Sequence, residues 1–247
     1  MLPLFTTKIM ENHNSEQPHA LFLGDSITAD GQYIRLAGEW LKKHRPQSGV
    51  RLTARGVPSE TASGLSEAAH PFPRPCIHER LTRELAEASP DVVVACYGMN
   101  DGIYHPFVAD RFAAYQDGMR RLSAQIHEAG AKVVLLTPPP FDALSMNGPL
   151  LPAEADDFSY LAPYRDYNRV LEHYADWLLS GGCPADQVID LRTPLLDHIR
   201  QERSINTAYR YGDGIHPDVS GHRVIAHTLL QELFGTEPEL WPDVRQE

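Results

Sequence analysis

The sequence has few of the residues that build disulfide frameworks or thiolate metal sites. Its 247 residues include three cysteines, and no two of them form a Cys-x-x-Cys pair. An odd number of cysteines without that spacing supports neither a disulfide framework nor a cysteine-rich zinc site. Histidine is plentiful, with twelve residues, but no His-Glu-x-x-His pattern occurs. We therefore expect no bound metal.

Long apolar runs and an excess of positive charge are also missing. No window approaches the ~20 apolar residues that a membrane-spanning helix needs, and the first residues lack the continuous apolar region of a secretory signal. The formal net charge is -11, and an acidic surface repels phosphate backbones and anionic lipid head groups. The sequence thus predicts no nucleic-acid partner, no membrane association and, by default, a cytoplasmic location.

The sequence does contain an alternation of short apolar runs with longer amphipathic segments, which is typical of parallel βαβ units. The predicted strands cover residues 20–23, 50–54, 91–97, 132–137 and 188–191. The predicted helices cover residues 33–43, 77–88, 107–129, 160–179 and 219–234. Together they predict a single α/β domain over residues 20–247, a three-layer α/β/α sandwich with a five-stranded parallel sheet, preceded by an arm over residues 1–19.

The ends of the predicted strands indicate where a ligand would bind. In doubly wound sheets the binding crevice lies at the carboxyl ends of the strands. The first three strands end close to Gly24, Arg55 and Gly98, so the loops that follow them should face one crevice. The longest irregular connection, residues 141–159, is either a binding loop or lid, or a surface excursion.

A serine, a histidine and an aspartate in these loops could carry acyl transfer. Ser26 directly follows the first strand, although a lone serine there could equally be a helix cap. His216 is the candidate general base, because a neutral imidazole can take the proton of a serine hydroxyl. Asp213 lies three residues earlier and could orient the imidazole. Asp218 is a rival for that role, but its place before the last predicted helix favours capping.

Three groups could stabilise the oxyanion that forms in acyl transfer. Gly56 has no Cβ to block the approach of a substrate to its backbone N–H, and Asn100 offers a side-chain amide. The backbone N–H of Ser26 is the third donor. Such donors typically contribute ~3 kcal/mol each to lowering the barrier.

Four sequence blocks occur along the chain in this order: LFLGDSIT, ARGVPSET, YGMND and DGIHP. With them the chain resembles the SGNH, or GDSL-type, serine hydrolases over nearly its whole length. The resemblance implies a flavodoxin-like SGNH hydrolase fold, without a metal or an organic cofactor. It implies Ser26 as nucleophile, Gly56 and Asn100 as oxyanion donors, and an Asp213–His216 pair that completes the triad.

Two positions depart from the usual pattern of that family. The first block reads GDSI rather than GDSL, and Met99 stands where a small or hydroxyl residue is common. The candidate substrate contacts are Asp25, Tyr104 and Phe141. The alternative for Tyr104 and Phe141 is packing within their loops, and for Asp25 it is bracing of the loop backbone.

The sequence therefore predicts a hydrolase of small carboxylic esters that works through an acyl-Ser26 intermediate. By analogy with the family, the substrate would be an acetylated carbohydrate or another short-chain acyl ester. Lysophospholipase, thioesterase and acyltransferase activities are alternatives on the same fold. A non-catalytic carbohydrate-binding protein is the alternative from another class.

Overall fold

Five short segments form the strands of a parallel sheet in the computed structural model, which describes residues 17–236. They are β1 (His19–Gly24), β2 (Arg51–Gly56), β3 (Val92–Cys96), β4 (Lys132–Leu136) and β5 (Gln187–Ile189). Their order across the sheet is β2-β1-β3-β4-β5, and every neighbouring pair is parallel. The predicted α/β architecture with a five-stranded parallel sheet is confirmed.

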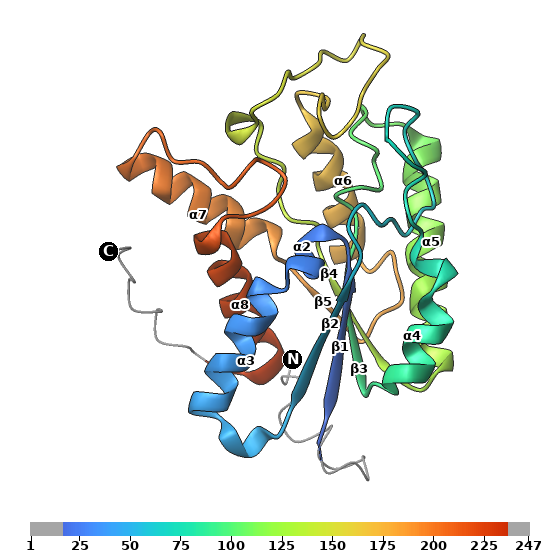
Figure 1. Ribbon diagram of the computed structural model, residues 1–247, viewed down its shortest axis with the longest axis vertical. Coiled ribbons are helices and arrows are strands. Elements are labelled where there is room, and N and C mark those ends of the chain that lie inside the picture. Colours follow the sequence, from blue (N-terminus) through green and yellow to red (C-terminus); the bar gives the residue numbers. More distant parts are fainter. Residues whose placement is uncertain (1–16, 237–247) are drawn as a thin grey trace.

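Side chains alternate between two apolar cores along the central strands, because successive residues of a strand point to opposite faces. In β3, Val93 and Ala95 belong to one core, and Val92 and Val94 belong to the other. The first core is covered by α4 (Leu81–Ala88), α5 (Ala109–Glu128) and α6 (Tyr167–Leu179). The second is covered by α3 (Gln32–His44), α7 (Arg192–Ile205) and α8 (Val219–Phe234). Figure 1 shows these two layers on either side of the sheet.

Several predicted boundaries differ from the structure. Helix α6 begins at Tyr167 rather than at residue 160, because the preceding backbone bonds elsewhere: the Tyr164 N–H donates to Tyr104 O at 2.9 Å. The predicted helix over 77–88 divides into a single turn, η2 (Ile77–Glu79), and α4. Helix α7 and the short α2 (Ser26–Asp30) were not predicted. His19 lies in β1 and not in the arm, whose first sixteen residues fall outside the described part.

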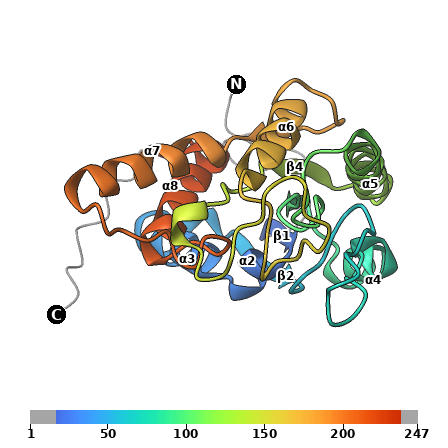
Figure 2. The same cartoon turned by 90° about the horizontal axis from the view of Figure 1, so that it is seen from above.

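The strand order creates a switch point at the carboxyl end of the sheet. From β2 the chain returns across β1 to form β3, so loops leave β1 and β3 in opposite directions and a crevice opens between them. Gly24 pairs with both Gly56 and Cys96, so the three strands end level. Figure 2 looks onto this end, where α2 and the segment around residues 141–166 lie over the strand ends.

The helices of residues 17–236 include none that is long and apolar enough to cross a membrane.

Candidate active site

Ser26 is the first residue of α2, directly after β1. Asp25 is the residue that caps this helix, because its Oδ1 accepts the N–H of Ile27 at 3.0 Å. The chain turns tightly here, and a Cβ at Gly24 would lie 2.8 Å from the carbonyl oxygen of Cys96. Capping is therefore the role of Asp25, and the hydroxyl of Ser26 is left to make another hydrogen bond.

A chain of two hydrogen bonds links Ser26 to His216 and Asp213. The Oγ of Ser26 lies 2.8 Å from Nε2 of His216. On the other side of the ring, Nδ1 lies 2.8 Å from Oδ2 of Asp213. A carboxylate can only accept, so Nδ1 carries a proton and Nε2 is left to take the proton of Ser26. The arrangement supplies a nucleophile, a base and an orienting carboxylate.

The local backbone explains how a carboxylate three residues before the histidine reaches its ring. Oδ1 of Asp213 accepts the N–H groups of Ile215 at 2.9 Å and His216 at 2.7 Å, which closes the turn around the carboxylate. Gly212 and Gly214 have φ values of 55° and 95°, in the left-handed region that favours glycine. A Cβ at Gly212 would also collide with the carbonyl oxygen of His216. The turn thus depends on both glycines.

The rival carboxylate, Asp218, has other partners. It is the N-cap of α8, and its Oδ1 accepts the N–H of Gly221 at 2.9 Å. It also accepts the hydroxyls of Ser220 and Tyr209. The geometry therefore pairs His216 with Asp213 and leaves Asp218 as a helix cap.

The hydrogen bond between His216 and Asp213 changes the pKa of both groups. It raises the pKa of His216 above the ordinary value of 6.5, although partial burial acts to lower it. Partial burial acts to raise the pKa of Asp213, but the hydrogen bonds from the ring and backbone of His216 and from the Ile215 N–H lower it to about 2. Asp213 is therefore ionised wherever the imidazole can act as a base.

The amide of Asn100 faces the same place from the end of β3. Its Oδ1 accepts hydrogen bonds from Nη1 of Arg74 at 2.9 Å and from the hydroxyl of Tyr104 at 3.0 Å. Its Nδ2 makes two longer contacts, to the carbonyl oxygen of Glu60 at 3.3 Å and to Oδ2 of Asp25 at 3.4 Å. Oδ1 thus accepts two well-formed hydrogen bonds, whereas the N–H groups of Nδ2 make only long, weak ones.

Gly56 does not reach this place. The N–H of Val57 donates to Gly24 O of β1 at 2.9 Å, and N–H groups alternate sides along a strand, so the N–H of Gly56 points to the outer edge of the sheet. A Cβ at Gly56 would lie 2.6 Å from the carbonyl oxygen of Asp25. Glycine is needed here because β2 packs closely on α2, and its N–H is not among the groups that the structure gathers.

Ser59 offers a backbone donor in place of Gly56. It lies in the turn after β2 with a φ of 66°, a left-handed conformation that costs a residue other than glycine roughly 1 kcal/mol or more. It lines the same pocket as Ser26 and Asn100. Within residues 17–236 its backbone N–H has no hydrogen-bond acceptor. A strained residue with an unused donor beside the nucleophile fits an oxyanion site.

The pocket beside Ser26 is small, with a volume of about 170 Å³. Its walls come from five separate segments, and the lining residues are Ser26, Pro58, Ser59, Arg74, Asn100, Tyr104, Tyr160, Ile215 and His216. Tyr104 is therefore where a substrate contact was predicted. Ligand pockets are commonly 300–1,000 Å³, so this one suits a small group.

The other two predicted substrate contacts lie outside the pocket wall. Asp25 is buried beneath it, and burial raises the pKa of its carboxyl to about 7. Phe141 is buried against Tyr167, with ring centroids 5.7 Å apart, and its N–H donates to Asn168. Both therefore support the loops around the pocket.

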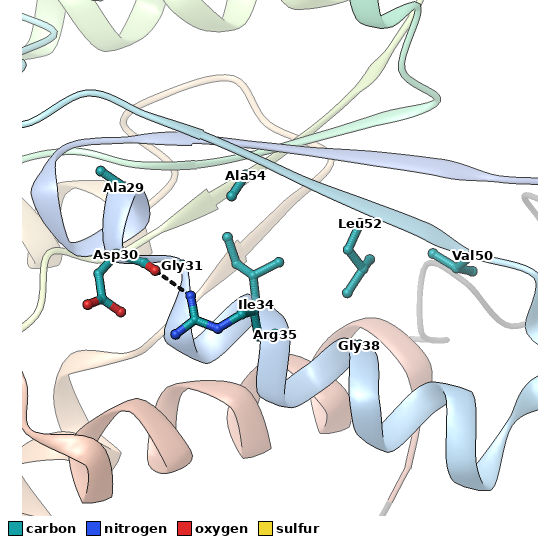
Figure 3. Close-up of a pocket in the computed structure, with 9 residues that line it drawn as sticks. All are labelled: Ala29, Asp30, Gly31, Ile34, Arg35, Gly38, Val50, Leu52 and Ala54. Carbon is teal, nitrogen blue, oxygen red and sulfur yellow. Dashed lines mark hydrogen bonds between the residues drawn. The ribbon is translucent and has the colours of Figure 1, made fainter.

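A larger hollow of about 450 Å³ lies between α3 and β2, away from the triad. Figure 3 shows Ile34 and Leu52 between the helix and the strand, and the hydrogen bond from Arg35 to the carbonyl oxygen of Asp30. Its walls are mainly apolar and contain none of the residues of the triad and none of the candidate oxyanion donors. Nowhere in the described residues do three or more His, Cys, Asp or Glu side chains gather as metal ligands would.

The long segment after β4 is attached to the catalytic turn. The N–H of Asp142 donates to Gly214 O at 2.8 Å, and the N–H of Tyr211 donates to Oγ of Ser145 at 2.7 Å. The carboxylate of Asp142 also forms an ion pair with Arg203 of α7. Further along, Tyr160 reaches the pocket wall. The segment is thus a support for the turn that carries Asp213, as well as a wall of the pocket.

Three lining residues with polar or aromatic side chains were not predicted: Ser59, Arg74 and Tyr160. A left-handed serine has no sequence signature, and Tyr160 was placed in a predicted helix. Arg74 lies among prolines in PFPRP, and nothing in that composition indicates a buried guanidinium. Long-range packing brings all three to the pocket.

One family of known proteins matches most of the chain. The GDSL-like Lipase/Acylhydrolase family matches residues 22–224 of the chain. No significant match was found among curated proteins.

Solved structures share the fold at low sequence identity. A catalytic mutant of an acetylxylan esterase from Geobacillus stearothermophilus has a TM-score of 0.59 and 18% identity, and the match covers 91% of this chain and 97% of that one. For an alpha/beta hydrolase enzyme from the metagenome of Lake Arreo, Spain, the TM-score is 0.61 at 20% identity, with 90% and 97% covered. For a gut microbial diltiazem-metabolizing enzyme the TM-score is 0.65 at 18% identity, with 90% and 48% covered.

The pairing of His216 with Asp213 predicts how the imidazole titrates. We expect an NMR titration to give a pKa above 6.5 for His216, because the carboxylate stabilises the imidazolium. Asp213→Asn should lower that pKa, whereas Asp218→Asn should leave it nearly unchanged. A larger shift in Asp218→Asn than in Asp213→Asn would make Asp218 the orienting residue.

Proposed function

This chain belongs to the GDSL-like lipase/acylhydrolase family, and we propose that it hydrolyses esters of short carboxylic acids through an acyl-enzyme on Ser26. The observation that carries the proposal is the unbroken chain of 2.8 Å hydrogen bonds from Ser26 through His216 to Asp213. A protein that only bound carbohydrate would need neither the base nor the carboxylate behind it.

The proposed reaction has two acyl-transfer steps. Oγ of Ser26 attacks the ester carbonyl carbon while its proton passes to Nε2 of His216. The tetrahedral intermediate collapses, the bond to the alcohol oxygen breaks, and the imidazolium gives its proton to the departing alcohol. Water then attacks the acyl-enzyme, its proton goes to the same nitrogen and returns to Ser26, and the carboxylic acid leaves. Asp213 stays ionised and stabilises the imidazolium.

Three donors would bind the oxyanion in this reaction: the N–H groups of Ser26 and Ser59 and Nδ2 of Asn100. The two backbone donors come from different loops, and the amide comes from a third. All three residues line the pocket. Preorganised donors of this kind stabilise the charge that develops in the transition state and need no rearrangement during the reaction.

The size and the rim of the pocket support a short acyl group on a carbohydrate alcohol. The volume of about 170 Å³ favours acetyl over longer chains. At the rim, the ring centroids of Tyr160 and His70 are 5.6 Å apart, and those of His70 and the half-exposed Phe72 are 4.6 Å apart. An exposed aromatic edge offers a flat apolar surface for a sugar ring. One solved structure of this fold is an acetylxylan esterase, and we propose acetylated saccharides as the substrate class.

Removal of the nucleophile tests the serine mechanism. We expect Ser26→Ala to lower the kcat for p-nitrophenyl acetate by roughly 10⁴-fold or more, because the three members of a triad act as a unit. Steady-state kinetics measures this loss, and a serine-reactive phosphonate should label the wild type and not the variant. Equal hydrolysis rates in the two proteins would overturn the mechanism.

The two kinds of oxyanion donor can be separated by substitution. Asn100→Ala removes a side-chain donor and should lower kcat by roughly 100- to 1,000-fold. Ser59→Gly keeps the backbone N–H and suits the left-handed backbone, so kcat should stay within about threefold of wild type. If Ser59→Gly lowered kcat as much as Asn100→Ala, the reaction would depend on the hydroxyl of Ser59 and not on its N–H.

The small volume of the pocket predicts which acyl lengths the protein accepts. Across p-nitrophenyl acetate, butyrate and octanoate, we expect kcat/KM to fall by roughly 10-fold or more, because each methylene that does not fit weakens transition-state binding. Acetate release from a panel of acetylated sugars and polysaccharides would then identify the alcohol. A kcat/KM that rose with chain length would instead favour a lysophospholipase.

A further inference from the structure

Arg74 is a buried cation beside the pocket, and the steps of the proposed reaction do not use it. It lies in the segment between β2 and η2, and its side chain is only 1% exposed. We propose that Arg74 is a positioning residue that fixes the amide of Asn100 so that Nδ2 faces the developing oxyanion. The proposal rests on the function proposed above and assigns a role to a residue outside the triad.

The contacts of Asn100 show why its amide has one orientation. A guanidinium can only donate, so the atom of Asn100 that lies 2.9 Å from Nη1 of Arg74 has to be the oxygen. If the amide were flipped, two donors would face each other inside the protein. The hydroxyl of Tyr104 donates to the same oxygen and supports the same orientation. Nδ2 must then point to the opposite side, where its contacts of 3.3 and 3.4 Å are long.

Arg74 is itself held firmly. Its Nε and Nη2 donate to the two carboxylate oxygens of Glu67 at 2.6 Å each, and both side chains are 1% exposed. The guanidinium carbon lies 5.4 Å from the ring centroid of Tyr104. With the Nε–Nη2 edge of the guanidinium paired with Glu67 and its carbon over the ring of Tyr104, Nη1 is held against Asn100 and, at 3.3 Å, against the carbonyl oxygen of Ser59. A bidentate fork of this kind cannot be reproduced by lysine, whose ammonium is a single point charge.

The energetics of the pair favour a functional role over a stabilising one. Burial of an ion pair carries a desolvation cost that its attraction often only offsets, and apolar residues of similar volume can be equally stable. In a surrounding of low dielectric, however, a charged donor on Oδ1 polarises the amide and strengthens the N–H groups of Nδ2 as donors. Arg74 would thus contribute to orientation and to donor strength through Asn100.

A second buried pair in the same region provides a matched control. Arg80 donates from Nε and Nη2 to both carboxylate oxygens of Glu60 at 2.6 and 2.7 Å. The further hydrogen bond of Arg80 goes to the carbonyl oxygen of Arg55 and not to Asn100. Arg80→Lys therefore perturbs a bidentate pair of similar geometry that does not contact Oδ1 of Asn100. Glu60 approaches the amide only with its backbone carbonyl oxygen, 3.3 Å from Nδ2.

A double-mutant cycle tests whether Arg74 acts through Asn100. We expect Arg74→Lys to lower kcat for p-nitrophenyl acetate by roughly 10- to 100-fold, while KM stays within about threefold of wild type. This loss of kcat is smaller than the loss expected when an oxyanion donor is removed altogether. In the Asn100→Ala background the same change should lower kcat by less than about threefold, because the group it positions is gone. Arg80→Lys should change kcat by less than about threefold in either background.

Two outcomes would overturn the proposal. One is an equal loss from Arg74→Lys with and without Asn100, and the other is an equal loss from Arg74→Lys and Arg80→Lys. Urea unfolding of each variant shows whether the fold is kept. If Arg74→Lys does not fold, a double variant replaces it in the cycle. This variant carries Glu67→Gln and Arg74→Gln together and so removes both charges.

A measurement without turnover separates this proposal from the proposed function. The side-chain amide of Asn100 gives a pair of NMR signals, assigned by their loss in Asn100→Ala. We expect Arg74→Lys to shift or broaden them and Arg80→Lys to leave them in place. Unmoved signals in Arg74→Lys would overturn the positioning role whether or not the wild type hydrolyses esters. A wild type that hydrolyses no ester while these signals shift would contradict only the proposed function.

Discussion

The site depends on one constraint: three parallel strands end at the same height in the sheet. Gly24 of β1 is in register with Gly56 on one side and Cys96 on the other. The loops that carry Ser26, Ser59 and Asn100 therefore start at the same height. A slip of one residue would turn every side chain of the strand to the opposite core, so the apolar packing of both faces holds the register and, with it, the relative positions of nucleophile and donors.

The strand ends bring the loops of the site close together, and buried polar groups then fix the positions of these loops. Beneath the pocket, each of three buried carboxylates has a partner: Asp25 accepts the N–H of Ile27, Glu60 pairs with Arg80, and Glu67 pairs with Arg74. Arg74 in turn donates to Asn100 in the loop after β3, which ties two loops together. Such groups are expensive to leave unpaired in a protein interior. Any movement of one loop would therefore break several contacts at once, and the site is preorganised as a consequence.

The sequence predicted the strands within one or two residues, most clearly for β3 and β4, whose apolar runs are rich in the β-branched residues that favour a buried strand. It also predicted α8, where Asp218 marks the start and Gly235 the end. It failed where tertiary packing decides. The backbone donor was expected from Gly56, which has no Cβ to block a substrate, whereas the donor that we propose is the N–H of Ser59, a residue in the left-handed conformation at the pocket. Arg74 could not be found, because its role depends on partners that are distant in the chain.

The distance along the chain between the two reacting side chains has a consequence for synthesis. Ser26 and His216 are 190 positions apart, and the helices next to them, α3 and α8, share one apolar core (Figure 1). A ribosome releases the serine long before the histidine. Until α8 has docked, the nascent chain carries a serine without a base, which is no more reactive than any other hydroxyl. In the proposed mechanism, completion of the fold is thus the event that turns Ser26 into a nucleophile.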